Sequence, residues 1–481
     1  MSFSSTLSIA TSGLTAASIR ARATAENIAN ANTDGYTRRV VTVEERRVGP
    51  SINGVRVANI SNVTNEFLTT ERLRLDADSS FASTRASAAE KLMTLVGEPG
   101  ADNGLFSLYA NFENALRDAA ATPESDLLLR GVVDKGRALA TNIQNMSRAA
   151  DQQRATADRQ IGLAVEEVNA SLKRLEELNA LPASKTTPEV IDERQRLVNS
   201  INEKIPVTMQ IRDNGINLIT DGGAFLLTER AQYLDFTPAG NVGRTQTLGS
   251  PLSGLSINGV DITPGGGAGQ QTRSGELAGL FEVRDTILPD FQDQLDALAT
   301  DLINRFADDT VDPTKTAGQS GLFTDGTTTP PTGVPLGIAN SLQINAAVDP
   351  QKGGATYRLR DGIGATSPGA TGNGDQLNRY ISAFTSQRTT IGALATSGTR
   401  SASELAADMS SNISFQERDY SESSLFASTR AEAATEAEFA ATGVDTDTEL
   451  QQLLLIEQAY AANARVIQIA GQMIDELMGL I

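Results

Sequence analysis

Both ends of the chain carry small and apolar residues that are alternately three and four positions apart. The amino-terminal series is Phe3, Leu7, Ala10, Leu14, Ala17, Ala21, Thr24, Ile28 and Ala31. The carboxy-terminal series is Leu453, Ile456, Tyr460, Asn463, Ile467, Ala470, Ile474, Leu477 and Ile481. This spacing is typical of a coiled-coil seam. Each end is therefore predicted to form a helix of about 30 residues, roughly 45 Å long.

Two interpretations of these helices stay open. They can pack on each other in one globular core, or they can pack against other subunits. Leu453, Leu454 and Leu455 are consecutive, so the apolar surface of the last helix is wider than a two-helix seam needs. Such surplus apolar surface favours further partners. The residues expected to make subunit contacts are Leu7, Leu14, Ile28, Leu453, Tyr460, Ile467 and Ile474.

The stretch "ENIANANTDGYTRR" at residues 26–39 is predicted to end the first helix and redirect the chain. Its asparagines weaken the helix after Ile28, and Asp34-Gly35 is typical of a tight turn. The β-rich sequence that follows contains Asn53-Gly54, which predicts a hairpin over residues 36–60. At the other end of the chain, Thr446 and Glu449 have capping-box spacing and predict the start of the last helix.

The middle of the chain alternates between helical and strand-like sequence patterns. Residues 62–146 and 161–175 have helical patterns, and a helix is predicted over 188–204. Short strands with glycine turns are expected over 207–273, and strand-like pieces such as "SLQINAAV" and "ATYRLR" lie within 307–397. The predicted fold class is α+β. A terminal coiled-coil domain with a hairpin takes 1–60 and 441–481, a helical domain takes 61–206, 275–306 and 398–440, and β-rich outer insertions take 207–274 and 307–397.

Composition argues against most kinds of catalysis. The 481 residues include no Cys, His or Trp, so thiolate and imidazole chemistry are both excluded. The net charge of -19 argues against nucleic acid as a partner. We expect no enzyme activity, metal or cofactor, although a glycosidase acting on cell wall through two carboxylates stays open as an alternative. The glycine run at 265–267 lacks the Lys-Ser or Lys-Thr of a phosphate loop.

The opening sequence also lacks the features of a Sec signal, since its first basic residue is Arg20 and Ser and Thr interrupt its apolar residues. No apolar run approaches the roughly 20 residues of a membrane-spanning helix. We therefore expect no cleaved signal peptide and no membrane insertion.

Several stretches resemble the axial proteins of the bacterial flagellum, the family of rod, hook and hook-associated proteins. "NIANANTDGY" at residues 27–36 is similar to the amino-terminal signature of this family, and residues 443–478 are similar to its carboxy-terminal helix. "GYTRR", "EFLTTERLRLD" at 66–76 and "IDERQRLVNSI" at 191–201 are closer to hook-associated proteins than to hook or rod proteins. Residues 274–299 point the same way. Asp34 stands where hook and rod proteins tend to carry Pro. The signature turn comprises Asn30, Asn32, Gly35 and Tyr36.

The resemblance implies a structural protein of the hook-filament junction, assembled as a ring or helix of identical subunits through its terminal helices. The implied partners are hook protein, a second junction protein (hook-associated protein 3) and an export chaperone that binds the last helix. The implied location is the extracellular flagellum, reached by type III export. A hook or distal rod protein stays open as the alternative within the family.

Overall fold

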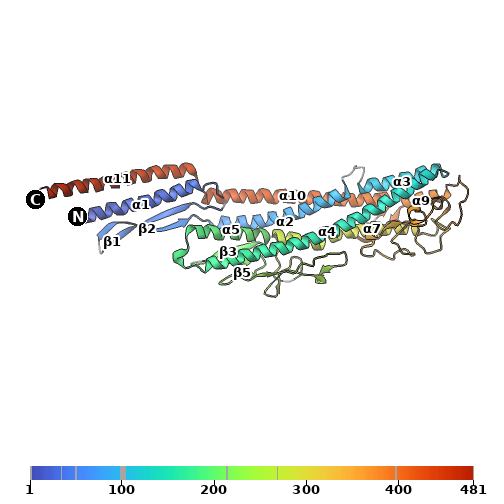
Figure 1. The fold of residues 1–481 in the computed structure, drawn as a ribbon, viewed down its shortest axis with the longest axis horizontal. Helices are drawn as coiled ribbons and strands as arrows, with labels where there is room; N and C mark the ends of the chain where they lie inside the picture. Colours follow the sequence, from blue (N-terminus) through green and yellow to red (C-terminus); the bar gives the residue numbers. More distant parts are fainter. Residues whose placement is uncertain are drawn as a thin grey trace. The chain divides into compact units, whose positions relative to one another are not determined.

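The computed structural model describes residues 3–33, 35–48, 51–97, 104–212, 215–267, 269–395 and 398–479. Figure 1 shows long helices accompanied by small sheets, which confirms the predicted α+β class. The chain forms two compact units, unit 1 with residues 1–79, 167–233 and 427–481, and unit 2 with residues 80–166 and 234–426. These units do not test the three-part division expected from the sequence, which stays a prediction.

Unit 1 contains both terminal helices, α1 (Phe3–Ala29) and α11 (Thr446–Met478). They lie side by side and run in opposite directions (Figure 1). Near the end of α1, the Arg38 N–H donates to the Thr442 carbonyl, 3.1 Å away. Farther along, Gly13 of α1 lies directly against the side chain of Asn463. The two heptad series therefore meet within one chain, over most of the length of both helices.

A two-stranded antiparallel ribbon packs on α1. Its strands are β1 (Arg39–Val48) and β2 (Ser51–Asn62), which confirms the hairpin predicted from the sequence. Ser12 Oγ donates to the Ile9 carbonyl and accepts the Val55 N–H at 3.0 Å, so it ties the ribbon to the helix. Gly54 permits this approach, because a Cβ there would lie 2.2 Å from Ser12 Oγ. The Asp34 part of the predicted turn lies outside the described residues.

The remaining elements of unit 1 lie beyond the hairpin in the sequence. They are the first part of α2 (Glu66–Val96), the end of α4 (Asp126–Asn179), a 3-10 turn (Ala183–Lys185), α5 (Pro188–Lys204), the last part of α10 (Ala402–Thr442), and an antiparallel sheet ordered β3 (Val207–Ile211), β4 (Ile216–Thr220) and β5 (Phe225–Leu227). α5 has the bounds predicted from the sequence. Pro188 sits in its first turn, where the missing N–H costs nothing.

Unit 2 is built on helices. They are the remainder of α2, α4 and α10, with α3 (Leu105–Ala121), α6 (Gly275–Glu282), α7 (Leu288–Ala307), α8 (Tyr357–Asp361) and α9 (Asp375–Thr385). A π-helical turn, Val283–Ile287, joins α6 to α7. The core is a cluster of buried rings from α3, α7, α9 and β11: Tyr109, Phe112, Phe306, Phe323, Tyr380 and Phe384. Phe112 and Phe384 pack edge to face, with centroids 5.5 Å apart.

Short strands and 3-10 turns complete unit 2. The strands are β6 (Leu234–Asp235), β7 (Thr247–Leu248), β8 (Pro251–Leu252), β9 (Ser256–Ile257), β10 (Val260–Asp261), β11 (Phe323–Thr324), β12 (Gln343–Ile344), β13 (Arg388–Thr389) and β14 (Thr399–Arg400). The 3-10 turns are Ile338–Asn340, Pro350–Lys352 and Gly392–Leu394. Each of these strands has two residues, so turns and loops, rather than a continuous sheet, make up most of this region.

Two local predictions are wrong. "ATYRLR" does not form a strand, because α8 begins at Tyr357 and buries Leu359 and Arg360. The cap of α11 is also one residue earlier than expected. Asp445 Oδ1 accepts the Thr448 N–H at 2.9 Å, while Thr446 is already the first helical residue. An aspartate before the helix supplies a good acceptor for its free N–H groups, so Glu449 is not needed for capping and lies buried instead.

Candidate assembly surface

The contact between α1 and α11 is narrow. On α1 it buries Ala10 and Ala17, which lie on the same side of the helix as Gly13. On α11 it buries Ile456 and Ala470, which are 4% and 7% exposed. Small side chains let the two backbones approach closely, and a Cβ at Gly13 would lie 2.8 Å from Asn463 Oδ1. The contact therefore uses one stripe of α11 and leaves the rest of this helix uncovered by α1.

The residues predicted to make subunit contacts lie along or beside this seam. Leu7, Tyr460 and Ile474 are 40%, 48% and 38% exposed. Leu14, Ile28, Leu453 and Ile467 are half-buried. The structure thus brings both series together within one chain and leaves several of their large side chains in solvent. Their role in contacts between subunits stays a prediction.

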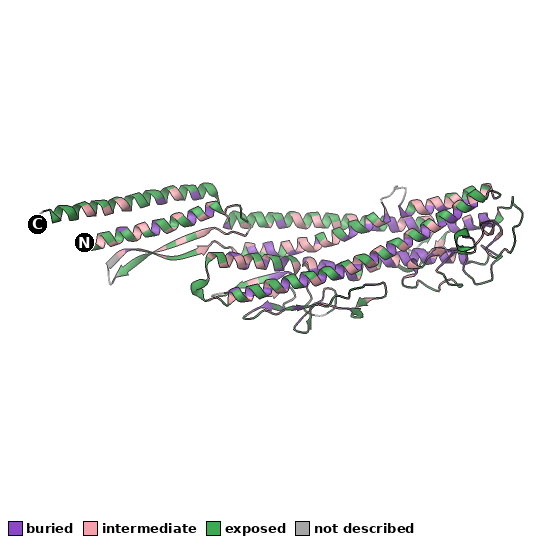
Figure 2. Cartoon of the chain, viewed as in Figure 1, coloured by how far each residue is buried: buried purple, intermediate pink, exposed green. Residues whose placement is uncertain are grey.

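A second apolar stripe runs along α11 and was not recognised in the sequence. It consists of Leu455, Ala459, Ala462, Val466, Ile469 and Met473, each one residue before a member of the first series. One residue corresponds to about 100° around a helix, so this stripe lies on a different side of α11 from the seam. All six residues are exposed, and Leu455, Ile469 and Met473 keep 65%, 44% and 47% of their surface in solvent. Figure 2 shows α11 as mainly exposed along its length.

The second stripe has the width and spacing of a surface that another helix covers. A helix with apolar residues on more than one face is normally covered on more than one side. The stripe keeps the three-and-four spacing that fits another helix. The signal in the sequence was the run of three leucines, since Leu455 starts the second stripe and Leu453 belongs to the first.

The signature turn is a dense hydrogen-bond network at the base of α1. Tyr36 Oη donates to Asn27 Oδ1 at 2.8 Å, and the Arg39 N–H donates to the same oxygen at 2.9 Å. Asn27 Nδ2 returns a bond to the Arg39 carbonyl at 3.0 Å. Burial raises the pKa of Tyr36 to about 12, although the nearby Arg39 opposes this shift. Asn27 thus fixes the angle at which the chain leaves the helix.

Asn30 and Gly35 also hold the signature turn in place, whereas Asn32 makes no such contribution among the residues that the structure describes. Asn30 Nδ2 donates to the Glu26 carbonyl at 2.9 Å and so closes the last turn of α1. Gly35 has a φ of 73°, and a Cβ there would lie 2.6 Å from Arg196 Cγ on α5. Glycine is therefore required at this position for both conformation and space. Asn32 is exposed.

Arg39 connects this turn to α5. Its guanidinium lies 2.9 Å from Glu26 and 2.8 Å from Glu189, and its Cζ is 5.0 Å from the Tyr36 ring centroid. Asp192 Oδ1 accepts the Thr37 hydroxyl at 2.8 Å. Burial raises the pKa of Asp192, while Thr37 and Arg39 act in the opposite direction. Sequence reasoning missed Asn27, Arg39 and Asp192 as important positions.

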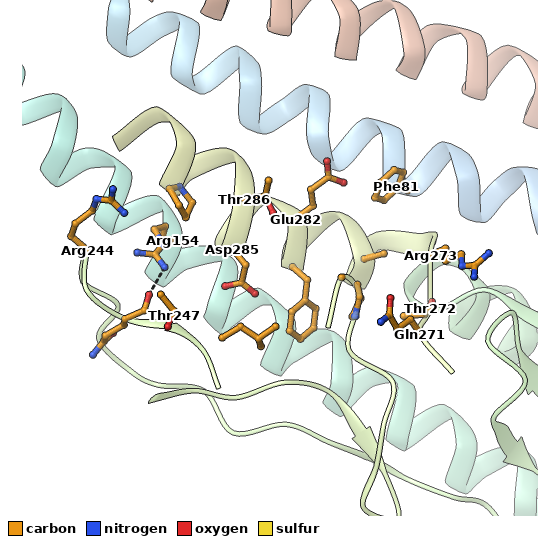
Figure 3. Close-up of a pocket in the computed structure, with 17 residues that line it drawn as sticks. Phe81, Arg154, Arg244, Thr247, Gln271, Thr272, Arg273, Glu282, Asp285 and Thr286 are labelled. Atoms are coloured by element: carbon orange, nitrogen blue, oxygen red, sulfur yellow. Dashed lines mark hydrogen bonds between the residues drawn. The ribbon is translucent and has the colours of Figure 1, made fainter. Parts of the chain in front are cut away.

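Unit 2 contains a cavity of about 610 Å3 (Figure 3). Arg154, Glu282 and Asp285 line it, and Arg154 donates to the Gln246 carbonyl at 2.7 Å. Arg284 holds Asp285 through two bonds of 2.9 and 2.8 Å. Glu282 lies 3.2 Å from Arg85, and burial raises its pKa.

Both carboxylates in this cavity are thus committed to arginines. This arrangement is that of structural ion pairs and offers no free acid and base pair for glycoside hydrolysis. Among the residues that the structure describes, no group of acidic side chains is arranged to hold a metal ion. No helix in the described ranges is both long and apolar enough to cross a membrane.

Comparisons with known proteins give matches at both termini and in the middle of the chain. The model for the helical domain of flagellar hook-associated protein FlgK matches residues 89–322. The flagella basal body rod protein model matches 7–37, and the carboxy-terminal model of flagellar basal body rod FlgEFG proteins matches 440–480. Over these ranges the chain is similar to flagellar hook-associated and rod proteins.

Individual relatives are distant. Flagellar hook-associated protein 1 of Salmonella typhimurium is 23% identical over 63% of this chain and 56% of its own length. Flagellar hook-associated protein 1 of Bacillus subtilis is 24% identical over 48% of this chain and 47% of its own length. The chain thus matches about half the length of these relatives. The flagellar hook junction protein FlgK from Burkholderia pseudomallei aligns with a TM-score of 0.43 and 20% identity, covering 54% of this chain and 46% of that one.

Proposed function

We propose that this chain is a structural adaptor at the junction of hook and filament, and that its copies assemble through their terminal helices. The observation that carries the proposal is the second stripe of α11. Its large residues are exposed in the single chain, and its spacing fits a helix. The match to the FlgK helical-domain model and the names of the relatives support the location at the flagellum.

The energetics favour another copy of this chain as the partner of the stripe. Burying one large aliphatic side chain stabilises a contact by roughly 1.5 to 3 kcal/mol. Leu455, Val466, Ile469 and Met473 are each about half exposed, so together they offer about twice this amount, roughly 3 to 6 kcal/mol, before the cost of association. The α1 helix of the same chain already covers Ile456 and Ala470 of the first series. A terminal helix of a neighbouring copy would present the same kind of surface.

The proposal extends to the other expected partners. The chain forms a ring or helical assembly that contacts hook protein on one side and hook-associated protein 3 on the other. Before assembly, an export chaperone covers the exposed face of α11. The chain then leaves the cell by the flagellar export route without cleavage of a signal peptide.

Electron microscopy of a strain that lacks the gene tests this proposal. The expected result is hooks without filaments, with filament protein shed into the medium. Full-length filaments on the deletion strain would overturn it. Loss of the hook itself would favour the hook or rod alternative, which the matches of both termini to rod-protein models keep open.

A further inference from the structure

Arg154 of α4 is a buried cation that bonds to backbone carbonyls. The residue is 1% exposed. Its Nε donates to the Arg284 carbonyl at 2.9 Å, and its Nη1 and Nη2 donate to the carbonyls of Gly243 and Gln246 at 3.0 and 2.7 Å. Within the described ranges no carboxylate forms an ion pair with it, and burial lowers its pKa although the nearby Asp285 opposes this shift. A buried charge without a counter-ion is costly, so an anion beside this arginine would offset part of that cost.

Arg154 lines the cavity of about 610 Å3 in unit 2. Figure 3 shows Arg154 and Asp285 at one end of this cavity, and Gln271 and Arg273 at the other. Small-molecule sites have volumes of roughly 300 to 1,000 Å3. Three of the five N–H groups of the guanidinium donate to the carbonyls, which leaves one N–H on Nη1 and one on Nη2 without an acceptor among the described residues. Such a pair fits the two oxygens of a carboxylate.

Both acidic side chains of the lining already have arginine partners. Arg284 holds Asp285, and Arg85 lies 3.2 Å from Glu282. Arg244 of the lining pairs in turn with two aspartates of α7. A ligand with a single negative charge would therefore balance the buried arginine. Phosphate carries up to two charges and would meet repulsion from the two acidic side chains.

A π-helical turn brings polar groups to the same cavity. It comprises Val283–Ile287, and the Leu288 N–H donates to a carbonyl five residues earlier. Asp285 and Thr286 of this turn line the cavity. Turns of this kind are rare and are frequently found at functional sites. The turn supports a binding role for the cavity independently of the buried arginine.

We propose that this cavity binds a ligand with one carboxylate on a flat apolar body. The carboxylate accepts the two remaining N–H groups of Arg154. The apolar body lies against Phe81, Leu248 and Phe281, which line the cavity, and the two rings favour an aromatic group. The site lies in unit 2, whereas the stripe on α11 lies in unit 1, so this inference does not depend on the proposed assembly.

Isothermal titration calorimetry of the full-length chain with 3-phenylpropanoate tests the proposal. The expected Kd is about 1 mM or tighter. The uncharged 3-phenylpropanamide should bind about tenfold or more weakly, because it cannot accept the pair of charge-assisted bonds, and inorganic phosphate should also bind more weakly. A short acetylated peptide that ends in phenylalanine carries the same chemistry at a chain end. Tighter binding of this peptide would assign the carboxylate to a peptide, and weaker binding would assign it to a small molecule.

Two variants locate the ligand in this cavity. Arg154→Lys keeps the charge but loses the fork of N–H groups, so affinity for 3-phenylpropanoate should fall about tenfold or more. Arg130→Lys is the matched control, because Arg130 lies on the same helix with 64% of its side chain exposed, and its affinity should be native. Since Arg154 also holds residues 243–246, Thr286→Phe supplies a test that leaves this arginine intact. Thr286 is exposed and lines the cavity, so a ring there should occupy the site and lower affinity by about the same factor.

The melting temperature of each variant is measured in parallel, and Thr286→Phe should melt as the native chain does. Failure of the native chain to bind 3-phenylpropanoate would overturn the proposal. Equal affinity for the acid and the amide, or native affinity in both lining variants, would overturn it as well. None of these results bears on contacts made by α11, so failure of this inference is distinguishable from failure of the proposed function.

Discussion

Substitutions at two isoleucines of α11 distinguish packing within the chain from packing between chains. Ile456 is 4% exposed and lies against α1, whereas Ile469 on the second stripe is 44% exposed. Burial of Ile456 is worth roughly 1.5 to 3 kcal/mol, and a carboxylate in its place costs several more. Ile456→Asp should therefore lower the free energy that holds α11 on α1 by more than about 3 kcal/mol. Ile469→Asp should change it by no more than about 0.5 kcal/mol, as for a surface substitution.

Hydrogen exchange of the free full-length chain, followed by mass spectrometry, measures the difference between the two variants in the free energy that holds α11 on α1. Amides of α11 should exchange more than about a hundredfold faster in Ile456→Asp, because each 1.4 kcal/mol is a tenfold change. In Ile469→Asp and in the control Gln468→Asp they should exchange at close to the native rate. Assembly into flagella should be lost in both isoleucine variants and retained in the control. Equal acceleration of exchange in the two isoleucine variants, or normal assembly of Ile469→Asp, would refute the assignment of two separate faces.

Three further predictions concern the signature turn and the core of unit 2. Gly35→Val should destabilise unit 1 by about 1 to 3 kcal/mol in chemical denaturation, and clearly more than Gly223→Val, which has a similar positive φ but open space around its Cβ. Tyr36→Phe should remove a tyrosine ionisation near pH 12 from the ultraviolet titration. Because folding raises this pKa, the stabilisation is complete below about pH 10 and is lost as the pH rises through 12. Arg284→Met should cost about 3 to 5 kcal/mol by leaving Asp158 buried and unpaired, and adding Asp158→Leu should recover part of that loss.

The sequence predicted the elements whose formation depends on neighbouring residues, namely the terminal helices, the hairpin and α5. The heptad series predicted both terminal helices, since each turn repeats the same requirement for an apolar face. Asn53-Gly54 predicted the hairpin, and Pro188 marked the start of α5. Short segments were harder to predict, since the segment at Tyr357 forms a helix instead of the expected strand. There the burial of Leu359 and Arg360 outweighed the strand-like local pattern.

The network around the signature turn could not be predicted in the same way. Asp192 meets Thr37 across 155 positions of sequence, and no local pattern marks either residue as a partner of the other. The second stripe of α11 was open to prediction, because it repeats the first series one residue earlier. The three consecutive leucines, Leu453 to Leu455, mark where it begins.

Electron cryomicroscopy of intact flagella from the source bacterium tests the central claim most directly. The account predicts density for this chain at the junction of hook and filament, with Leu455, Val466 and Ile469 of α11 buried against a neighbouring copy. Density at the junction in which these three side chains face solvent would contradict assembly through the second stripe. Absence of the chain from the junction would contradict the proposed function as a whole.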